Sequence, residues 1–124
     1  MKALYTSVLT AMLAVTSVSF AQAQPAASMV NGVLVNAQGM TLYSFDKDVP
    51  NSGTSMCQGA CLSLWPAASA SADAKPEGSL TLIKREDGSQ QWAYQGKPLY
   101  TYSLDKKPGD TLGDKVKDVW HVIR

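Results

Sequence analysis

Two cysteines and one histidine are the side chains in this sequence best suited to chemistry. Cys57 and Cys61 are the only cysteines, and His121 is the only histidine. The first 23 residues have a signal-peptide pattern, which indicates export, and an even number of cysteines in an exported protein favours a disulfide. Spacing of four residues on a helical turn brings the two Cα atoms to about 6 Å, within the range that a disulfide spans. We therefore expect Cys57 and Cys61 to be bonded to each other.

A redox or metal role for the same three residues is the alternative. A thioredoxin-like pair has two residues between its cysteines, whereas Cys57 and Cys61 have three, and Leu62 stands where a c-type haem motif needs histidine. Thiolates, imidazole and methionine sulfur could hold copper, but the spacing fits no established pattern. We predict no metal site and no cofactor. The alternative function is a periplasmic redox or metal-handling protein using Cys57, Cys61 and His121.

The stretch from residue 39 to residue 48 occurs a second time, without a gap, from residue 96 to residue 105. All matched positions are 57 residues apart: Gly39 and Gly96, Leu42 and Leu99, Tyr43 and Tyr100, Phe45 and Tyr102, Asp48 and Asp105. A tryptophan follows each copy, Trp65 after the first and Trp120 after the second. The chain is therefore built from two copies of one unit, and only the first copy carries cysteines.

The repeated aromatic residues allow two interpretations. On a strand, Tyr43 and Phe45 lie on one face, as do Tyr100 and Tyr102. With the tryptophans they could form a stacking surface for a ring-bearing ligand or a sugar, or they could form the core of a small domain, which we favour. We assign no catalytic residue and predict that the protein is not an enzyme.

The repeated aspartates are expected to hold loops in place. Asp48 and Asp105 follow the aromatic pairs, where a carboxylate commonly accepts backbone N–H bonds from the next loop. Such bonds favour the charged carboxylate, so we expect a pKa below the usual value for each. Since the two aspartates lie in separate loops, the costs of removing them should add.

Turn residues divide the chain into short strands. We expect strands over 29–36 and 40–45 as a hairpin, then a helix over 57–64 that ends before Pro66. After a polar connector, further strands are expected over 80–85, 90–94, 99–102 and 119–123. The prediction is a mainly β fold: small antiparallel sheets from two pseudo-repeated halves, about 29–66 and 80–124, within one domain, 24–124, with one short disulfide-bearing helix.

The first 23 residues have the pattern of a secretory signal peptide. A basic start with Lys2 precedes an uncharged, apolar segment that ends in Ala21-Gln22-Ala23, a typical cleavage site, and we expect a helix there. No cysteine stands at this site to carry a lipid, so we expect no stable membrane anchor after cleavage. Removal of Lys2 leaves ten basic and ten acidic residues with no basic cluster, which argues against nucleic acid as a partner.

Both copies match the pattern Y-x-[FWY]-x-x-D, as Tyr43 to Asp48 and Tyr100 to Asp105. With the cysteine pair and the terminal tryptophan, the sequence resembles the bacterial secreted repeat of unknown function family, predicted lipoproteins with the YX(FWY)XXD motif. The resemblance covers about residues 30–124 and implies an exported bacterial protein without an established activity. We expect a periplasmic or secreted, non-catalytic binding or structural module whose partner is an unknown envelope protein or small ligand.

Overall fold

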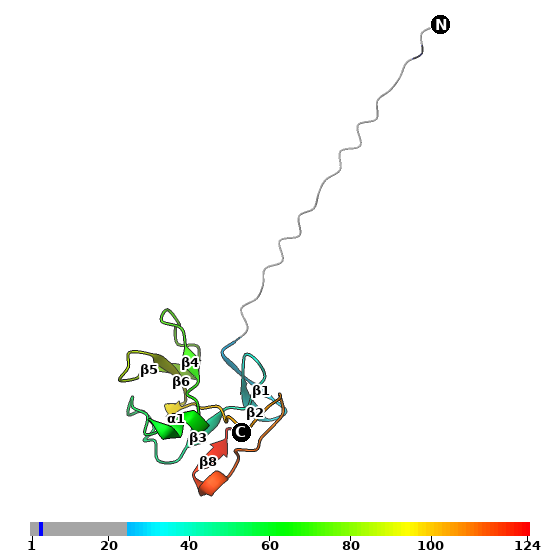
Figure 1. Ribbon diagram of the computed structural model, residues 1–124. Helices are drawn as coiled ribbons and strands as arrows, with labels where there is room; N and C mark the ends of the chain where they lie inside the picture. The colour runs from blue at the N-terminus through cyan, green and yellow to red at the C-terminus, as the bar shows by residue number, and fades with distance from the viewer. Residues whose placement is uncertain (1–2, 4–24) are drawn as a thin grey trace.

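The computed structural model describes Ala3 and residues 25–124, so the expected signal peptide and its helix lie outside the described residues. The described elements are β1 (Ala27–Val30), β2 (Val33–Asn36), β3 (Tyr43–Phe45), α1 (Ala60–Leu64), β4 (Ser69–Ala70), β5 (Leu80–Lys84), β6 (Gln90–Tyr94), β7 (Lys97–Pro98), the 3-10 helix η1 (Val116–Asp118) and β8 (Trp120–Val122) (Figure 1). Among these residues no helix is long and apolar enough to cross a membrane.

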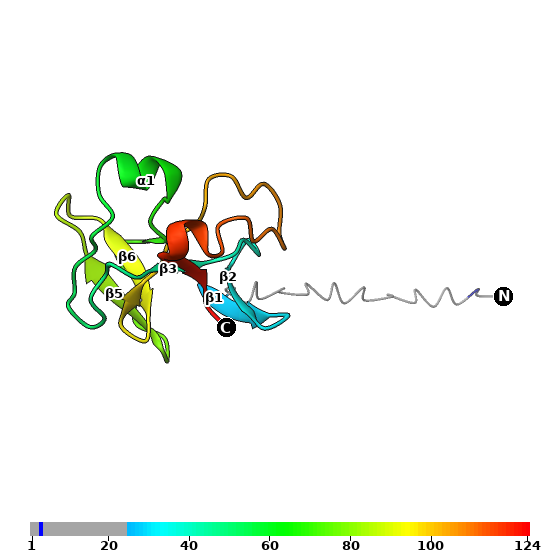
Figure 2. The ribbon, with the colours of Figure 1, turned by 90° about the horizontal axis from the view of Figure 1, so that it is seen from below.

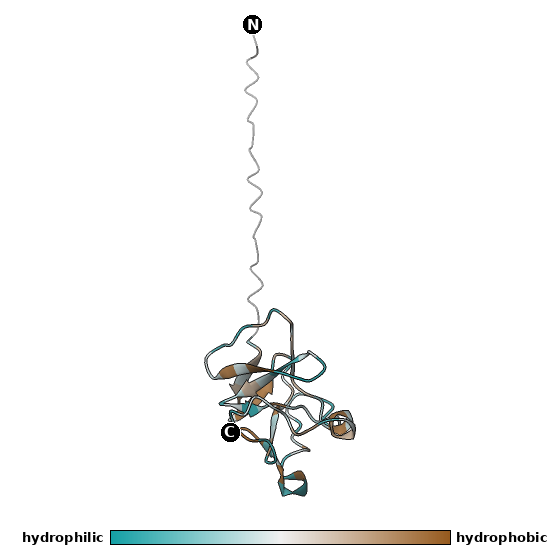
Figure 3. Ribbon diagram, turned by 90° about the vertical axis from the view of Figure 1, so that its left-hand side faces the viewer, coloured by the Kyte–Doolittle hydropathy of each residue, from teal (hydrophilic) through white to brown (hydrophobic). Residues whose placement is uncertain are grey.

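The strands form three small antiparallel sheets, which confirms the predicted mainly β class. β1 pairs with β2, β3 pairs with β8, and β4, β6 and β5 lie side by side with β7 on β6. Figure 2 shows α1 and the loop before η1 on one side of these strands. Figure 3 shows hydrophobic residues along both the strands and the short helices.

The segment expected as one strand over 29–36 is instead a hairpin of β1 and β2. Its turn residues, Asn31 and Gly32, have φ of 51° and 78°. Positive φ at both central residues is the requirement of a type I′ turn, and Asn-Gly is the pair that satisfies it most readily. The prediction of a single strand over 29–36 overlooked this turn signal.

The helix is shorter than the expected span of 57–64. Only Ala60–Leu64 is helical, and Gly59 before it has φ of 60°, in the left-handed region that a right-handed helix cannot contain. The helix therefore begins after Cys57 and ends before Trp65 and Pro66, as the proline predicted.

Several strand pairs join the N-terminal half of the described chain to its C-terminal half. We call residues 25–70 the first half, residues 71–79 the connector and residues 80–124 the second half. β3 of the first half pairs with β8 of the second, and β4 of the first pairs with β6 of the second. At the centre, Tyr43 and Tyr100 exchange two backbone hydrogen bonds of 2.8 and 3.0 Å.

Equivalent backbone bonds then recur on the two sides of this central pair. Leu34 donates its N–H to Ile123 O at 2.9 Å, and Trp92 donates to Ala68 O at 2.8 Å. A second such pair consists of Asp46 N–H to Val119 O at 2.8 Å and Ser103 N–H to Leu64 O at 2.9 Å. In every case a residue of one half bonds to the other half, so the halves are related by an approximate two-fold axis.

Both hydrophobic clusters of the core are shared between the halves in the same way. The larger cluster is made of buried Tyr43, Cys57, Trp65, Tyr100, Tyr102, Trp120 and Val122. The smaller one is made of buried Leu34, Leu42, Leu80 and Leu99. Since each half supplies roughly half of each cluster, neither has a complete core of its own.

Candidate functional site

The tyrosine of each motif is bonded to the aspartate of the other motif. The Tyr43 hydroxyl donates to Asp105 Oδ2 at 2.6 Å, and the Tyr100 hydroxyl donates to Asp48 Oδ2 at 2.7 Å. The central backbone pairing of the two tyrosines places each phenol beside the loop of the opposite half. The repeated motif thus forms two crossed Tyr–Asp pairs in the interior.

The second carboxylate oxygen of each aspartate holds the loop that follows it. Asp48 Oδ1 accepts the Met56 N–H at 2.6 Å, and Asp105 Oδ1 accepts the Leu112 N–H at 2.9 Å. These are bonds of the kind that the sequence led us to expect for the two aspartates. Each carboxylate therefore joins its own loop to the tyrosine of the other half.

The remaining motif aromatics and the two tryptophans form one stack of four rings. Trp65 and Trp120 lie parallel at its centre, with ring centroids 3.8 Å apart and planes inclined by 4°. Phe45 stacks on Trp120 at 4.2 Å, and Tyr102 stacks on Trp65 at 4.2 Å. Each outer ring thus covers the tryptophan of the opposite half, and we call this group the aromatic stack.

These rings are core residues and do not form an open ligand surface. Tyr43 and Tyr100 have no exposed area, and Trp65 and Trp120 are each 3 % exposed. Tyr102 is buried, and only Phe45 among the six rings is half-buried. A ligand could not stack on them without opening the interface between the halves.

The Tyr100–Asp48 pair has polar support that its counterpart lacks. Ser55 Oγ is hydrogen-bonded to the Tyr100 hydroxyl, whereas the Tyr43 hydroxyl accepts the backbone N–H of Gly113 at 3.2 Å. Nearby, Arg85 donates to Cys57 O at 2.9 Å and to Gln91 Oε1 at 2.6 Å. Sequence reasoning missed Ser55, Arg85 and Gln91, because none of them belongs to the repeated motif.

Burial governs the titration of this interior group. Desolvation raises the pKa of Tyr43 and of Tyr100 far above the usual phenol value, and the adjacent carboxylates add to the rise. Desolvation also raises the pKa of Asp48, against the opposing hydrogen bonds from Met56 and Tyr100. The expectation of a lowered pKa was therefore wrong for Asp48, because the desolvation of the carboxylate outweighs its two hydrogen bonds.

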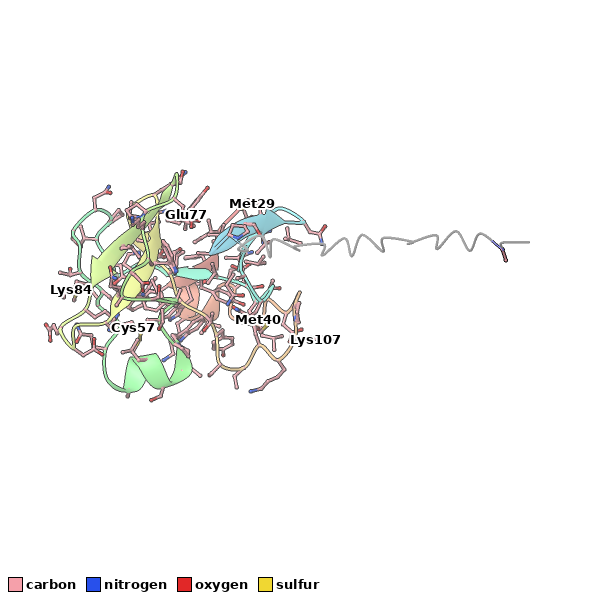
Figure 4. The ribbon with its side chains drawn as sticks, turned by 90° about the horizontal axis from the view of Figure 1, so that it is seen from above. Met29, Met40, Cys57, Glu77, Lys84 and Lys107 are labelled. Atoms are coloured by element: carbon pink, nitrogen blue, oxygen red, sulfur yellow. A yellow bond between two sulfur atoms is a disulfide. The ribbon has the colours of Figure 1, made fainter. Side chains whose placement is uncertain are left out.

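The cysteines form the predicted disulfide. Cys57 and Cys61 are bonded with their Cα atoms 5.3 Å apart, and Figure 4 shows Cys57 beside α1. Cys57 is fully buried in the larger cluster with Trp120. The bond therefore fastens the loop after Asp48 and the start of α1 to the core.

His121 lies on the other side of its strand from that cluster. It alternates with buried Trp120 and Val122 along β8, and its Nε2 is 2.8 Å from Asp46 Oδ2 on the exposed side. Within residues 25–124 and Ala3, no group of three or more histidine, cysteine or acidic residues is placed to hold a metal ion. The structure does not bring His121 and the cysteines together.

A hollow of about 420 Å³ lies beside Trp92 and is lined from both halves. Its lining contains no charged side chain, and its polar members are Asn36, Gln38, Ser69 and Thr101. Trp92 is half-buried and packs on the smaller cluster, so its ring forms part of the floor. We call this site the uncharged hollow.

A second hollow of about 270 Å³ occupies the equivalent position across the approximate two-fold axis. Ser44, Gln95 and Ile123 line it at the places that Thr101, Gln38 and Ala68 have in the uncharged hollow. Its other lining residues include one acidic side chain, Asp46, and three basic ones, Lys97, His121 and Arg124. The fold thus has two hollows at equivalent positions, one without charged side chains and one with several. We call the second one the charged hollow.

The comparisons with known proteins agree with the repeat seen in the structure. Neither the comparison with curated proteins nor the one with solved structures found a match. One protein family matches twice, over residues 28–69 and 81–124, which are the motif-bearing parts of the first and second halves. The chain belongs to the family described as a secreted repeat of unknown function.

Proposed function

We propose that this protein is a non-catalytic binding module of the bacterial envelope, acting in the periplasm or outside the cell after removal of its signal peptide. Membership of a secreted family supports export. The most distinctive residues of the sequence, the two motifs, point into the core and join the halves. That arrangement supports a scaffold role for the motifs and leaves recognition to the outer surface.

The observation that carries the proposal is the lining of the uncharged hollow. Its 420 Å³ lie within the range of about 300–1,000 Å³ typical of small-molecule sites. An indole ring, two side-chain amides and two hydroxyls line it, without any charge. Amides and hydroxyls both donate and accept hydrogen bonds, and an indole face packs on apolar C–H groups. The ligand that fits this lining is a neutral, hydroxyl-rich ring, such as one unit of a saccharide.

Binding should be tested by calorimetric titration with N-acetylglucosamine and its short oligomers. The test variant is Trp92→Leu, which removes the indole ring and keeps an apolar side chain at this position; its equivalent across the two-fold axis by backbone bonding is Leu34. We expect saturable binding by the wild type and at least tenfold weaker binding by Trp92→Leu, about 1.4 kcal/mol. The matched control, Lys97→Ala in the charged hollow, should bind like the wild type.

Two results would overturn this assignment. Absence of saturable binding to any neutral saccharide would remove the ligand class, and full affinity in Trp92→Leu would remove the site. A redox or metal role for Cys57, Cys61 and His121 has less support, because the two sulfurs are bonded to each other and His121 pairs with Asp46 on the opposite side of β8.

A further inference from the structure

We propose that each half is a docking partner for the complementary half of a second copy of this chain, so that two chains can exchange halves through the connector. This inference is independent of the proposed ligand. It rests on a property of the fold: the surfaces that close the domain belong to the two halves in equal measure. The partner is a second copy of this chain, and the interface is the one already present within a single chain.

The backbone bonds show how completely each half depends on the other. β3 and β4 have strand partners only in the second half, and β8 has its partner only in the first, among the strand pairs of the described chain. The Tyr43–Tyr100 pair and the symmetric bonds from Leu34 and Trp92 also cross between the halves. An isolated half would leave these donors and acceptors without protein partners.

The side chains depend on the other half in the same way. Separation of the halves would uncover both faces of Trp65, which lies between Trp120 and Tyr102. It would also leave Asp48 and Asp105 without their tyrosine donors. Both clusters would be divided, so the favourable state of a half is one in which a complementary half covers it, whichever chain supplies that half.

The connector has the properties of a hinge. Residues 71–79 are exposed except for half-buried Ala74, and they include Pro76 and Gly78. The hydrogen bonds that hold them all go to the second half: Gln90 Nε2 donates to the carbonyls of Ser71 and Ala72, Glu77 and Leu80 exchange two backbone bonds, and Gln95 N–H donates to Ser79 O. Opening of the connector would therefore disturb little of the interior, and exchange of identical elements is a low-cost route to dimers.

The sheet geometry fixes the least length that the connector needs within one chain. Ala70 at the end of β4 pairs with Gln90, whereas Leu80 at the start of β5 pairs with Tyr94, at the other end of β6. The connector must therefore cross the sheet by two strand spacings and run along it by the length of four residues. The straight distance between its ends is roughly 17 Å. The nine connector residues reach about 33 Å when extended, so the wild type closes on itself easily.

The first experiment is complementation between two defective full-length chains. Trp65→Ser damages only the first half, and Trp120→Ser damages only the second. Alone, each chain should lose the near-ultraviolet circular dichroism of the packed aromatic stack. Co-refolded at equal concentration with the Cys57–Cys61 bond intact, they should recover about half of the wild-type signal, in a species of twice the chain mass. The recovered domains combine the two undamaged halves.

The second experiment shortens the connector in an otherwise native chain. Deletion of residues 72–78 leaves about 11 Å of chain between Ala70 and Leu80, too little for the path of roughly 17 Å. The variant should be a dimer by light scattering with wild-type near-ultraviolet circular dichroism. A control with the same seven positions changed to glycine and serine should remain like the wild type.

The two experiments together decide the proposal. If either tryptophan variant folds alone, the connector deletion becomes the decisive test. A folded monomer after the deletion would overturn the inference, because closure within one chain would then not need the connector. Failure of the deletion variant to fold at all, together with no recovery in the complementation mixture, would also overturn it, since exchange should rescue both.

Discussion

The two Tyr–Asp pairs share one geometry and differ in what surrounds them. In both, an aspartate joins a loop N–H to the tyrosine of the opposite half. Around Asp48 the support is polar and covalent, with Ser55, Arg85 and the adjacent disulfide. Around Asp105 the support is close backbone packing at Gly113, where an added Cβ would lie 2.7 Å from the Trp65 ring.

This difference separates what the repeat requires from what each copy adds. The Tyr–Asp geometry recurs because the approximate two-fold axis requires both pairs to fit the same central strands. The surroundings lie outside the motif and differ between the copies, with polar groups on one side and a glycine on the other. The hollows follow the same pattern, since one is uncharged and its counterpart contains one acidic and three basic side chains.

The largest predicted effect concerns the turn glycines that precede each motif. A Cβ on Gly96 would lie 2.9 Å from the backbone N of Asn51, which donates to Gly96 O at 2.9 Å. A Cβ on Gly39 would meet only the Pro108 side chain, at 3.3 Å. Both glycines have positive φ, so both alanine variants are strained. We expect Gly96→Ala to cost about 3 kcal/mol and Gly39→Ala about 1 kcal/mol in chemical denaturation. Equal costs would show that the backbone contact at Asn51 relaxes.

The next effect concerns the aspartates themselves. Asp105→Ala leaves the Leu112 N–H and the buried Tyr43 phenol without an acceptor. Asp48→Ala leaves the Met56 N–H without one, and Ser55 Oγ remains as a partner for the Tyr100 hydroxyl. Each variant should therefore cost about 1–3 kcal/mol. The sequence suggested additive costs, but the two phenols belong to tyrosines that are bonded to each other at the centre. We therefore expect the double variant to deviate from the sum by at least about 0.5 kcal/mol. A strictly additive cycle would show that the two pairs act independently.

The matched positions of the repeat show how much of this fold could be predicted from the sequence. The matched residues, from Tyr43 and Tyr100 outward, correctly predicted a mainly β fold of two related halves, and the cysteine spacing correctly predicted the disulfide. The pairing of strands of one half with strands of the other half was not predicted. Alternation tells which face of a strand is buried, but Trp120 could satisfy it against Tyr102 of its own half as well as against Phe45.

The site was less predictable, for a related reason. Arg85 and Ser55 lie outside both copies of the motif, so comparison of the copies could not identify them. The pKa direction of Asp48 depends on burial, and burial depends on the cross-half packing that local pattern does not specify. Within the two Tyr–Asp pairs, only the bonds from the aspartates to their own loops, which are local in sequence, could be anticipated.

A third prediction concerns alkaline pH. The buried phenols of Tyr43 and Tyr100 have folded pKa values raised above the usual value of 10.0. Their contribution to stability is fully present below pH 10 and is lost as pH rises toward the folded pKa, because the unfolded chain ionises first. For each of the two phenols, the free energy of unfolding should fall by about 1.4 kcal/mol per pH unit above pH 10. Tyr43→Phe should make the measured slope shallower by that amount, whereas Tyr94→Phe, at a half-buried tyrosine outside the two pairs, serves as the control.

The smallest effect is at acid pH and concerns the carboxyl group of Asp48. The folded pKa of Asp48 is raised, mainly by desolvation, with Arg85, Tyr100 and the Met56 N–H opposing the rise. A raised folded pKa means that the stability from this group is fully present below the unfolded pKa and is lost as pH rises through the folded pKa.

Asp48→Asn removes this titration and retains a side chain of nearly the same shape. We therefore expect the free energy of unfolding of the wild type, relative to that of Asp48→Asn, to fall between pH 3 and pH 7. Subtraction of the two pH curves cancels the other titrating groups. A difference that grows in favour of the wild type with rising pH would show that the hydrogen bonds to the carboxylate outweigh its desolvation.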